Sequence, residues 1–306
     1  MPAVDLSHYL VLGISSRALF DLNEENKIYE EQGLDAYCKY QIEHENEILK
    51  PGTGFPLIQA ILKLNEFDSS KRRTEVVIIS RNSSDTSLRI SNSINHYGLD
   101  VTRAAFTGGQ AVAKYLSAFD VDLFLSASEE DVQTAVECRI AAGLIYDLPS
   151  DNTQEIDQIR IAFDGDAVLF SEESEMIYQK HGLEAFVKHE QANANKPLPE
   201  GPFARLLKTL SYLQNQLDYK KLNYDKPPIR TALVTARNSP AHERVIRTLR
   251  TWGVRIDETF FLGGVRKDKV LAAFAPHIYF DDQPRHCDDA SKLVPTARVP
   301  LPRNSD

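Results

Sequence analysis

The sequence predicts an α/β fold made of two tandem parallel-sheet domains that arose by internal duplication. The chain repeats itself: Gly98–Gly109 reads GLDVTRAAFTGG and Gly253–Gly264 reads GVRIDETFFLGG, at a shift of 155 residues. Short apolar runs also alternate with helix-favouring stretches in both halves. That alternation is typical of parallel strands joined by right-handed helical crossovers.

The elements follow the same order in each half. Each copy opens with a short apolar run that reads as a buried strand, and a long acidic, helix-favouring stretch follows it. A Pro/Gly segment, a second helical pattern and further apolar runs come next. The strands are expected near Leu10–Ile14, Glu75–Ile79, Ile159–Phe163 and Thr231–Val234, and later at the sequences VDLFL and HIYF.

The repeat also sets the domain boundaries. SRNS at Ser80–Ser83 matches ARNS at Ala236–Ser239, and the earlier blocks around Gly33 and Gly182 match at a shift of 149. We therefore expect domains at residues 1–150 and 158–306, with the polar stretch Pro149–Asp157 as the linker. Ser171–Arg230 separates two strands of the second copy.

Composition excludes several classes of protein. The chain has 306 residues, 42% of them hydrophobic, and a net charge of −9. This charge argues against nucleic acid as the main partner. Cys38, Cys138 and Cys287 are too scattered for a disulfide framework, which suits a reducing compartment. No apolar run has the length of a transmembrane helix, and the N-terminus lacks the basic start of a signal peptide. A cytoplasmic protein without a membrane partner is expected.

The two copies differ at the ends of their strands. The second carries the acids, the threonine and the lysine that chemistry would use: Asp164, Asp166, Thr235, Lys267, Asp281 and Asp282. The sequence match places these against Ser15, Arg17, Ile79, Val112, Ser126 and Ala127. If the strands are parallel neighbours, the second set converges on one edge of the sheet. The second copy then reads as catalytic and the first as a degenerate duplicate.

Phosphoryl transfer is the chemistry that fits this set. One carboxylate can attack phosphorus and form an aspartyl-phosphate, and a second can protonate the leaving oxygen. Clustered carboxylates repel a phosphate, so a divalent cation is needed, and Mg²⁺ suits carboxylate and phosphate oxygens. A lysine, a hydroxyl and backbone N–H groups then stabilise the charge on the transferring oxygens.

DGDAV, a strand-end threonine, a lysine and a terminal DD, in this order, resemble the haloacid dehalogenase superfamily of phosphohydrolases. RIAFDGDAVLFSEESE, LVTAR, TLRTWG and IYFDD, with ISSRALFDL in the first half, are more similar still to the cytosolic 5′-nucleotidase type I family. The resemblance covers about Tyr9 to Gln283. It implies two Rossmann-like domains and Mg²⁺-dependent hydrolysis of nucleoside 5′-monophosphates, AMP being the leading substrate.

The resemblance also implies roles for single residues. Asp164 becomes the nucleophile and Asp166 the general acid and base. The implied phosphate ligands are Thr235, Ala236, Lys267 and Gly165, and the implied metal ligands are Asp164, Asp166, Asp281 and Asp282. A helical cap over the site is implied at about residues 172–228.

The sequence leaves alternatives for several of these roles. Asp281 is preferred to Asp282 for the metal, and Lys267 to Lys269 or Arg266 for the phosphate. Arg237 either binds phosphate or, since Arg81 matches it in the first copy, has a shared structural role. The aromatic residue that would stack on a base is one of Phe170, Tyr178, Phe186 and Phe203.

Other functions also remain open. The same motifs suit a broader phosphatase or a phosphotransferase, and a nucleotide sensor with secondary catalysis is a third reading. The first copy keeps Gly108–Gly109 and the SRNS turn, so it is either a scaffold or a regulatory site for ADP or ATP. The oligomeric state is open, with a homo-oligomer among the options.

Overall fold

The computed structural model describes residues 5–67, 71–147, 158–217 and 225–303. The chain divides into two compact units, residues 1–147 (unit 1) and 148–306 (unit 2). The linker predicted at Pro149–Asp157 lies outside the described residues. No helix in the described ranges is long and apolar enough to cross a membrane.

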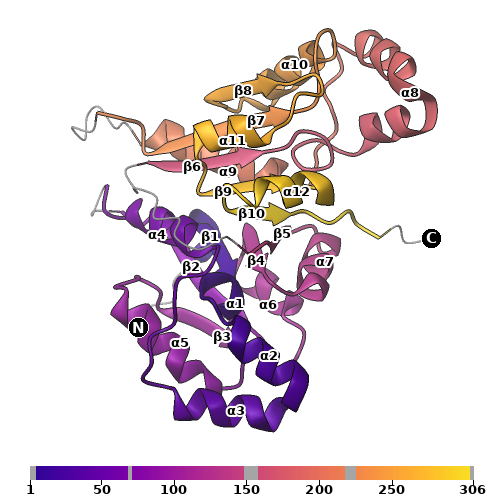
Figure 1. The fold of residues 1–306 in the computed structure, drawn as a ribbon. Coiled ribbons are helices and arrows are strands. Elements are labelled where there is room, and N and C mark those ends of the chain that lie inside the picture. Colours follow the sequence, from indigo (N-terminus) through magenta and orange to yellow (C-terminus); the bar gives the residue numbers. More distant parts are fainter. Residues whose placement is uncertain (1–4, 68–70, 148–157, 218–224, 304–306) are drawn as a thin grey trace. The chain divides into compact units, whose positions relative to one another are not determined.

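Unit 1 is a five-stranded sheet with helices between its strands (Figure 1). The strand order is β3-β2-β1-β4-β5, and every pair is parallel. Its strands are β1 (Leu10–Ile14), β2 (Thr74–Ser80), β3 (Arg103–Phe106), β4 (Leu123–Ser126) and β5 (Ala141–Ile145). Its α-helices are α1 (Ser16–Leu19), α2 (Asn23–Gln32), α3 (Leu34–Glu43), α4 (Phe55–Lys63), α5 (Leu88–His96), α6 (Ala113–Ala118) and α7 (Glu129–Glu137). Short 3₁₀ turns stand at η1 (Leu6–His8) and η2 (Asp85–Ser87).

Unit 2 has a sheet of the same kind. Its strand order is β10-β9-β6-β7-β8, again parallel throughout. Its strands are β6 (Ile159–Phe163), β7 (Ile229–Thr235), β8 (Glu258–Phe261), β9 (Ile278–Asp281) and β10 (Thr296–Arg298). Its helices are α8 (Glu173–Ala192), α9 (Ala204–Gln216), α10 (His242–Trp252), α11 (Asp268–Phe274) and α12 (Pro284–Ala290).

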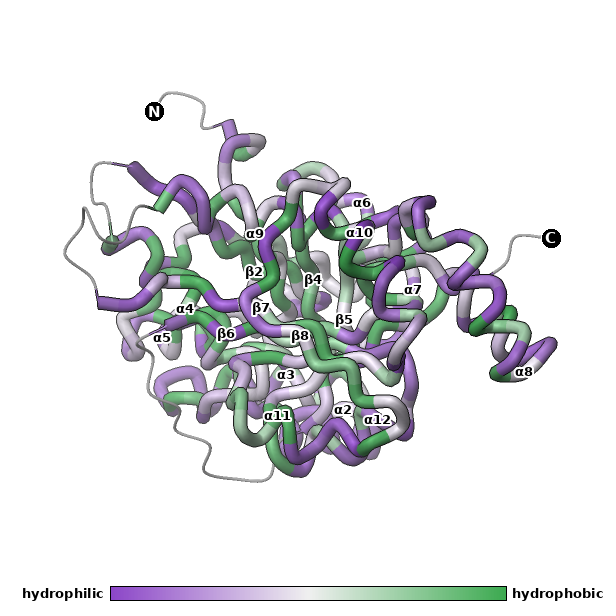
Figure 2. Tube along the Cα trace, turned by 90° about the horizontal axis from the view of Figure 1, so that it is seen from above, coloured by the Kyte–Doolittle hydropathy of each residue, from purple (hydrophilic) through white to green (hydrophobic). Residues whose placement is uncertain are grey.

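The predicted α/β class with parallel sheets is confirmed. Counted along each unit, the strands lie in the order third, second, first, fourth, fifth. The central strands are almost fully buried: every residue of β1, β2 and β4 is buried in unit 1, and in unit 2 every residue of β9 and four of the five in β6. In Figure 2 several strands and the helix α4 are hydrophobic, while much of α8 is hydrophilic. Strands buried on both faces read as continuous apolar runs, which is why the sequence located them.

The strand register differs by one residue from the match made on sequence. Ile14 pairs with Ile78 in unit 1, and Phe163 with Leu233 in unit 2. Two residues further on, Thr235 therefore lies at the register position of Ser80, and not of Ile79 as predicted. The sequence match was aligned on the identical RNS tripeptides, and this alignment differs by one residue from the strand pairing.

The same correction applies to Arg237. Gly263 donates its N–H to the Arg237 carbonyl at 3.3 Å, and Gly108 donates to the Asn82 carbonyl at 2.9 Å. Arg237 therefore lies at the position of Asn82, and not at that of Arg81. The strand-end hydroxyl is kept in unit 1, whereas the arginine is replaced by an amide.

A helical hairpin follows the first strand of each unit. Gly33, at φ 85°, separates α2 from α3, and Gly182, at φ 76°, bends α8 into two segments. Positive φ costs glycine little, so both bends fall where the sequence repeats a glycine. Helix α9 differs from this hairpin because it buries one apolar face, formed by Leu206, Leu207, Leu210 and Leu213. Of the described residues between 172 and 228, α8 forms the helix with few buried positions that a cap would need.

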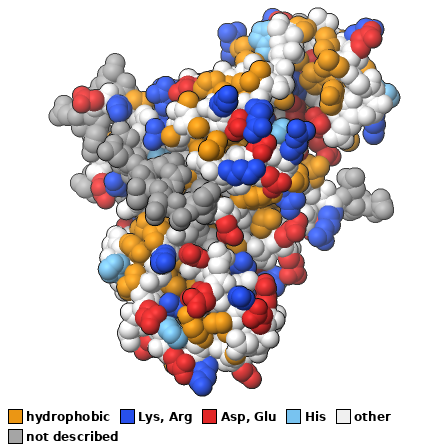
Figure 3. Space-filling view, in the orientation of Figure 1, with side chains coloured by type: hydrophobic (Ala, Val, Ile, Leu, Met, Phe, Trp, Pro, Cys, Tyr) orange, Lys and Arg blue, Asp and Glu red, His pale blue; other side chains and the backbone are white. Residues whose placement is uncertain are grey.

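The surface of each unit mixes both signs of charge. On the face drawn in Figure 3, acidic and basic side chains are interspersed. All three cysteines are free, as their scatter in the sequence predicted.

Candidate active site

The first, second and fourth strands of unit 2 deliver the predicted site residues to one edge of the sheet. Asp164 directly follows β6, Asp281 ends β9, and both strands run parallel as neighbours. Lys267 lies immediately before α11. Although far apart in sequence, these residues meet because parallel strands end at the same edge.

Lys267 lies between two buried carboxylates. Its Nζ is 2.8 Å from Oδ1 of Asp164 and 2.7 Å from Oδ2 of Asp281. Lys267 is 7% exposed, whereas the alternative Arg266 is exposed and pairs with Asp268 at 2.8 Å. The preference for Lys267 therefore agrees with the geometry of the site.

Asp164, Asp281 and Asp282 form a carboxylate cluster. One oxygen from each lies within 4.8 Å of the others, and no other such group occurs within the described ranges. Burial, with the negative charges of Asp164 and Asp281, raises the pKa of Asp282 to about 8. Burial also raises the pKa of Asp164 against the pull of Lys267. Burial acts in the same direction on Asp281, but Lys267 and His286 outweigh it and lower its pKa.

The cluster has the chemistry of a site for a hard divalent cation. Three carboxylates face a single ammonium group, so the site carries an excess of negative charge when all three are ionised. In an octahedral Mg²⁺ site with bonds of about 2.1 Å, opposite ligands are about 4.2 Å apart. The three carboxylate oxygens lie within 4.8 Å of one another, so small side-chain movements would bring them around the ion. Three carboxylates are a donor set that suits Mg²⁺.

Asp166 stands outside the carboxylate cluster. Arg237 donates to both of its oxygens, from Nε to Oδ2 at 2.8 Å and from Nη2 to Oδ1 at 2.6 Å. Arg237 also donates a short hydrogen bond to Glu190 on α8. Arg244 on α10 donates to the other oxygen of Glu190 at 2.9 Å. We call Asp166, Arg237, Glu190 and Arg244 the arginine network.

Sequence reasoning missed most of the arginine network. Glu190 is 1% exposed, yet it lies in a stretch so rich in charge that it reads as a solvated helix. Its only signal was recurrence, since a histidine and a glutamate follow each other in both halves. Arg237 was left between phosphate binding and a structural role, and the structure gives it two buried ion pairs.

The remaining predicted phosphate ligands line the same strand ends. Thr235 ends β7 and is 2% exposed, and its Oγ1 accepts the Arg237 N–H at 3.2 Å. Exposed Ala236 follows it. A Cβ built on Gly165 would lie 3.2 Å from Oγ1 of Thr235, and Gly165 does not have a positive φ. The absence of a side chain at Gly165 thus allows the close approach of the Thr235 hydroxyl.

Burial decides among the four aromatic candidates for base stacking. Phe170 and Phe203 are fully buried in the unit, so neither can meet a base. Phe186 is 8% exposed and has the Arg237 guanidinium 5.4 Å from its ring centre. Tyr178 is 47% exposed and lies edge-on to Phe186 at 6.3 Å. Tyr178 is thus the most accessible of the four.

Comparisons with known proteins identify the family of the chain. The sequence profile of the 5′-nucleotidase family matches residues 2–306. Human cytosolic 5′-nucleotidase 1B is 39% identical over 290 residues, which cover 93% of this chain and 47% of the human protein. The chain thus spans about half the length of that relative. No solved structure matches the chain. The profile and the identity together show that the chain belongs to the 5′-nucleotidase family.

Proposed function

We propose that the chain is a Mg²⁺-dependent phosphoric monoester hydrolase that cleaves nucleoside 5′-monophosphates of the AMP type. The observation that carries this proposal is the pair of contacts that Lys267 makes with Asp164 and Asp281, within the carboxylate cluster. Family membership and the name of the human relative support the class of substrate. That relative is named cytosolic, and we propose the same compartment here.

Asp164 is the nucleophile in this proposal. Its carboxylate oxygen attacks phosphorus, the bond from phosphorus to the 5′ oxygen breaks, and an aspartyl-phosphate forms. Mg²⁺, held by the carboxylate cluster, would neutralise the charge that otherwise repels the phosphate. Lys267 and Thr235 bind the phosphate oxygens, together with the backbone at Gly165 and Ala236.

Asp166 moves the proton. It gives a proton to the leaving 5′ oxygen and then takes one from the water that attacks the aspartyl-phosphate, which releases phosphate and restores Asp164. Because Arg237 holds both oxygens of Asp166, at least one of these hydrogen bonds must open during turnover. Glu190 offers Arg237 a second partner on α8, so we propose that α8 is the cap and that closing it positions Asp166.

We also propose that the two units derive from one duplicated domain of the haloacid dehalogenase type. Equal strand order, a glycine bend after the first strand and the matching register at Ser80 and Thr235 support this origin.

Phosphate release measured across a panel of nucleoside monophosphates, with and without Mg²⁺, tests the function. Hydrolysis of AMP that requires Mg²⁺ and disappears in Asp164→Asn supports it. Including a nucleoside acceptor separates hydrolysis from phosphotransfer, since transfer would produce a new monophosphate. Metal-independent turnover, or turnover of simple phosphate esters in preference to every nucleotide, contradicts the proposal.

A further inference from the structure

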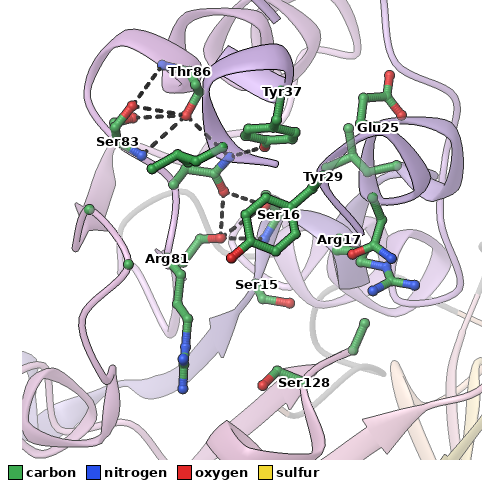
Figure 4. A pocket seen from close by; sticks show the side chains of 18 of the residues that line it. Ser15, Ser16, Arg17, Glu25, Tyr29, Tyr37, Arg81, Ser83, Thr86 and Ser128 are labelled. Atoms are coloured by element: carbon green, nitrogen blue, oxygen red, sulfur yellow. Dashed lines mark hydrogen bonds between the residues drawn. The ribbon is translucent and has the colours of Figure 1, made fainter. Parts of the chain in front are cut away.

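Unit 1 contains a cavity of about 540 Å³ at the carboxyl ends of its strands. Ser15, Ser80 and Ser126 line it from the ends of β1, β2 and β4, and Figure 4 shows Arg17, Tyr29 and Tyr37 around the same space. Small-molecule sites commonly have volumes of about 300–1,000 Å³. The size suits a ligand as large as a mononucleotide.

The cavity lacks the means to hold a divalent cation. Ser15, Ser126 and Ala127 stand where unit 2 has the carboxylate cluster. No group of three metal-binding side chains occurs within the described residues of unit 1. A ligand that binds here must therefore do so without the metal that the site in unit 2 is built to hold.

The cavity instead holds one cation, Arg17, that no described residue neutralises. Arg17 takes the place of Asp166, while Asn82 takes that of Arg237, so Arg17 forms no hydrogen bond or ion pair with any described residue. The acids that line the cavity are already neutralised. Glu25 pairs with Arg89 at 2.6 Å, and Asp131 pairs with Arg81 at 2.6 Å. Glu130, the second partner of Arg81, is largely exposed to solvent.

Three serine hydroxyls supply further hydrogen-bond donors beside Arg17. Ser15, Ser126 and Ser128 each accept a backbone N–H, at 3.3, 3.1 and 3.3 Å. None of the three donates its own hydrogen to an acceptor within the described residues, so each O–H is available to a ligand. Ser126 is 1% exposed and Ser15 is 8% exposed. Buried donors of this kind need a partner, and a phosphate oxygen is a strong acceptor.

Two tyrosines also line the cavity. Tyr29 is 51% exposed and lies edge-on to Tyr37 with ring centres 6.0 Å apart. Tyr37 accepts hydrogen bonds from Asn82 at 2.8 Å and from Gln41 at 3.1 Å, which fix its ring. A flat base can stack on such a surface.

We propose that the unit 1 cavity binds a mononucleotide without a metal ion, with its phosphate on Arg17 and the serine hydroxyls and its base against Tyr29. This site is separate from the proposed catalytic site and stands whether or not unit 2 hydrolyses nucleotides.

Binding of AMP to the full chain in EDTA tests the proposal, with calorimetry on the Asp164→Asn background to prevent turnover. Arg17→Gln should weaken binding by about tenfold or more, as expected for loss of a charged hydrogen bond. Arg17→Lys, which keeps the charge, should retain part of the affinity. Arg139→Gln is the matched control, because Arg139 is an exposed arginine of unit 1 outside the cavity lining.

Adenosine and inorganic phosphate complete the panel. Each should bind more weakly than AMP, because adenosine lacks the phosphate contacts and inorganic phosphate lacks the contacts of the base. Equal affinity of the Arg17→Gln and Arg139→Gln chains for AMP overturns the proposal, as does adenosine binding as tightly as AMP. Ser126→Asp should weaken AMP binding in EDTA by repulsion, and unchanged binding would also contradict the site. Thermal unfolding of each variant confirms that it is folded.

Discussion

Units 1 and 2 have the same strand order but different charge at corresponding strand ends. In unit 2 the ends of the first and fourth strands carry the carboxylate cluster, and Lys267 reaches into it. In unit 1 the same positions carry hydroxyl, methyl and isopropyl side chains, at Ser15, Ser126, Ala127 and Val112. The parallel sheet is common to both, so the chemistry is decided by a few side chains at one edge of it.

The two units also differ in how they pair a buried arginine further from the strand ends. Arg89 and Arg244 stand near the starts of α5 and α10. In unit 1 the carboxylate that pairs with Arg89 comes from Glu25, at 2.6 Å, and the amide of Gln41 lies 3.3 Å away. In unit 2 the acid comes from Glu190, whose own neighbour is the hydroxyl of Ser174 at 2.9 Å. Each unit neutralises its arginine: in unit 1 the acid lines the cavity, and in unit 2 it also pairs with Arg237.

The largest expected difference between the units is at the residue that follows the first strand. Asp164→Asn should reduce kcat at least about a thousandfold, roughly 4 kcal/mol of barrier, because it removes the attacking oxygen. Ser15→Ala, the matched change in unit 1, should leave kcat within about twofold, since that hydroxyl takes no part in the chemical step. Steady-state phosphate release measures both. Equal losses in the two variants would show that the units share the catalysis.

Metal removal should affect unit 2 alone. EDTA should lower AMP hydrolysis by about a hundredfold or more, and Mg²⁺ should restore it, because the carboxylate cluster otherwise repels the phosphate. Ca²⁺ should restore little activity, as its longer bonds and looser shell disturb the geometry. The control is AMP binding in EDTA, which unit 1 should retain. Full hydrolysis after exhaustive chelation would refute the metal site.

Glu190 tests the arginine network. Glu190→Gln should destabilise the chain by about 3 kcal/mol, because it leaves buried arginine charge without its carboxylate. It should also lower kcat about tenfold, by freeing Arg237 from α8. Glu184→Gln on the same helix is the control, since Glu184 is 84% exposed and pairs only with Lys188. Chemical denaturation and kcat together separate a positioning effect from a purely structural one.

The stability gap between wild type and Glu190→Gln should also depend on pH. Burial opposes ionisation of Glu190, yet Arg237 and the other partners outweigh it and lower its pKa from the usual 4.5. A lowered folded-state pKa stabilises the fold above the unfolded value and loses that effect as pH falls through the folded value. The gap should therefore be full above about pH 4.5 and shrink below it. A gap that stays constant down to acid pH would contradict the charge argument.

The sequence could predict the strands and the convergence of the acids because both depend on local patterns. Buried parallel strands read as apolar runs, and residues that end them must share an edge. The pairing of Asp166 with Arg237 could not be predicted, because it depends on which way two side chains turn after their strands end. The one-residue register error at Thr235 has a similar origin, since short identical tripeptides carry no information about backbone pairing.

The smallest expected effect concerns Gly165, for which unit 1 has Ser16. In unit 1 the Ser16 hydroxyl lies 2.9 Å from that of Ser80, so a side chain is accommodated beside the strand-end hydroxyl. In unit 2 an added Cβ would meet Oγ1 of Thr235 at 3.2 Å and must displace it by a few tenths of an ångström. Gly165→Ala should therefore lower kcat severalfold with little change in melting temperature, because a phosphate ligand shifts while the core is untouched. Ser16→Ala in unit 1 should leave kcat unchanged. If Gly165→Ala turned over AMP as fast as the wild type, Thr235 would not need its present position, and its role as a phosphate ligand would have to be given up.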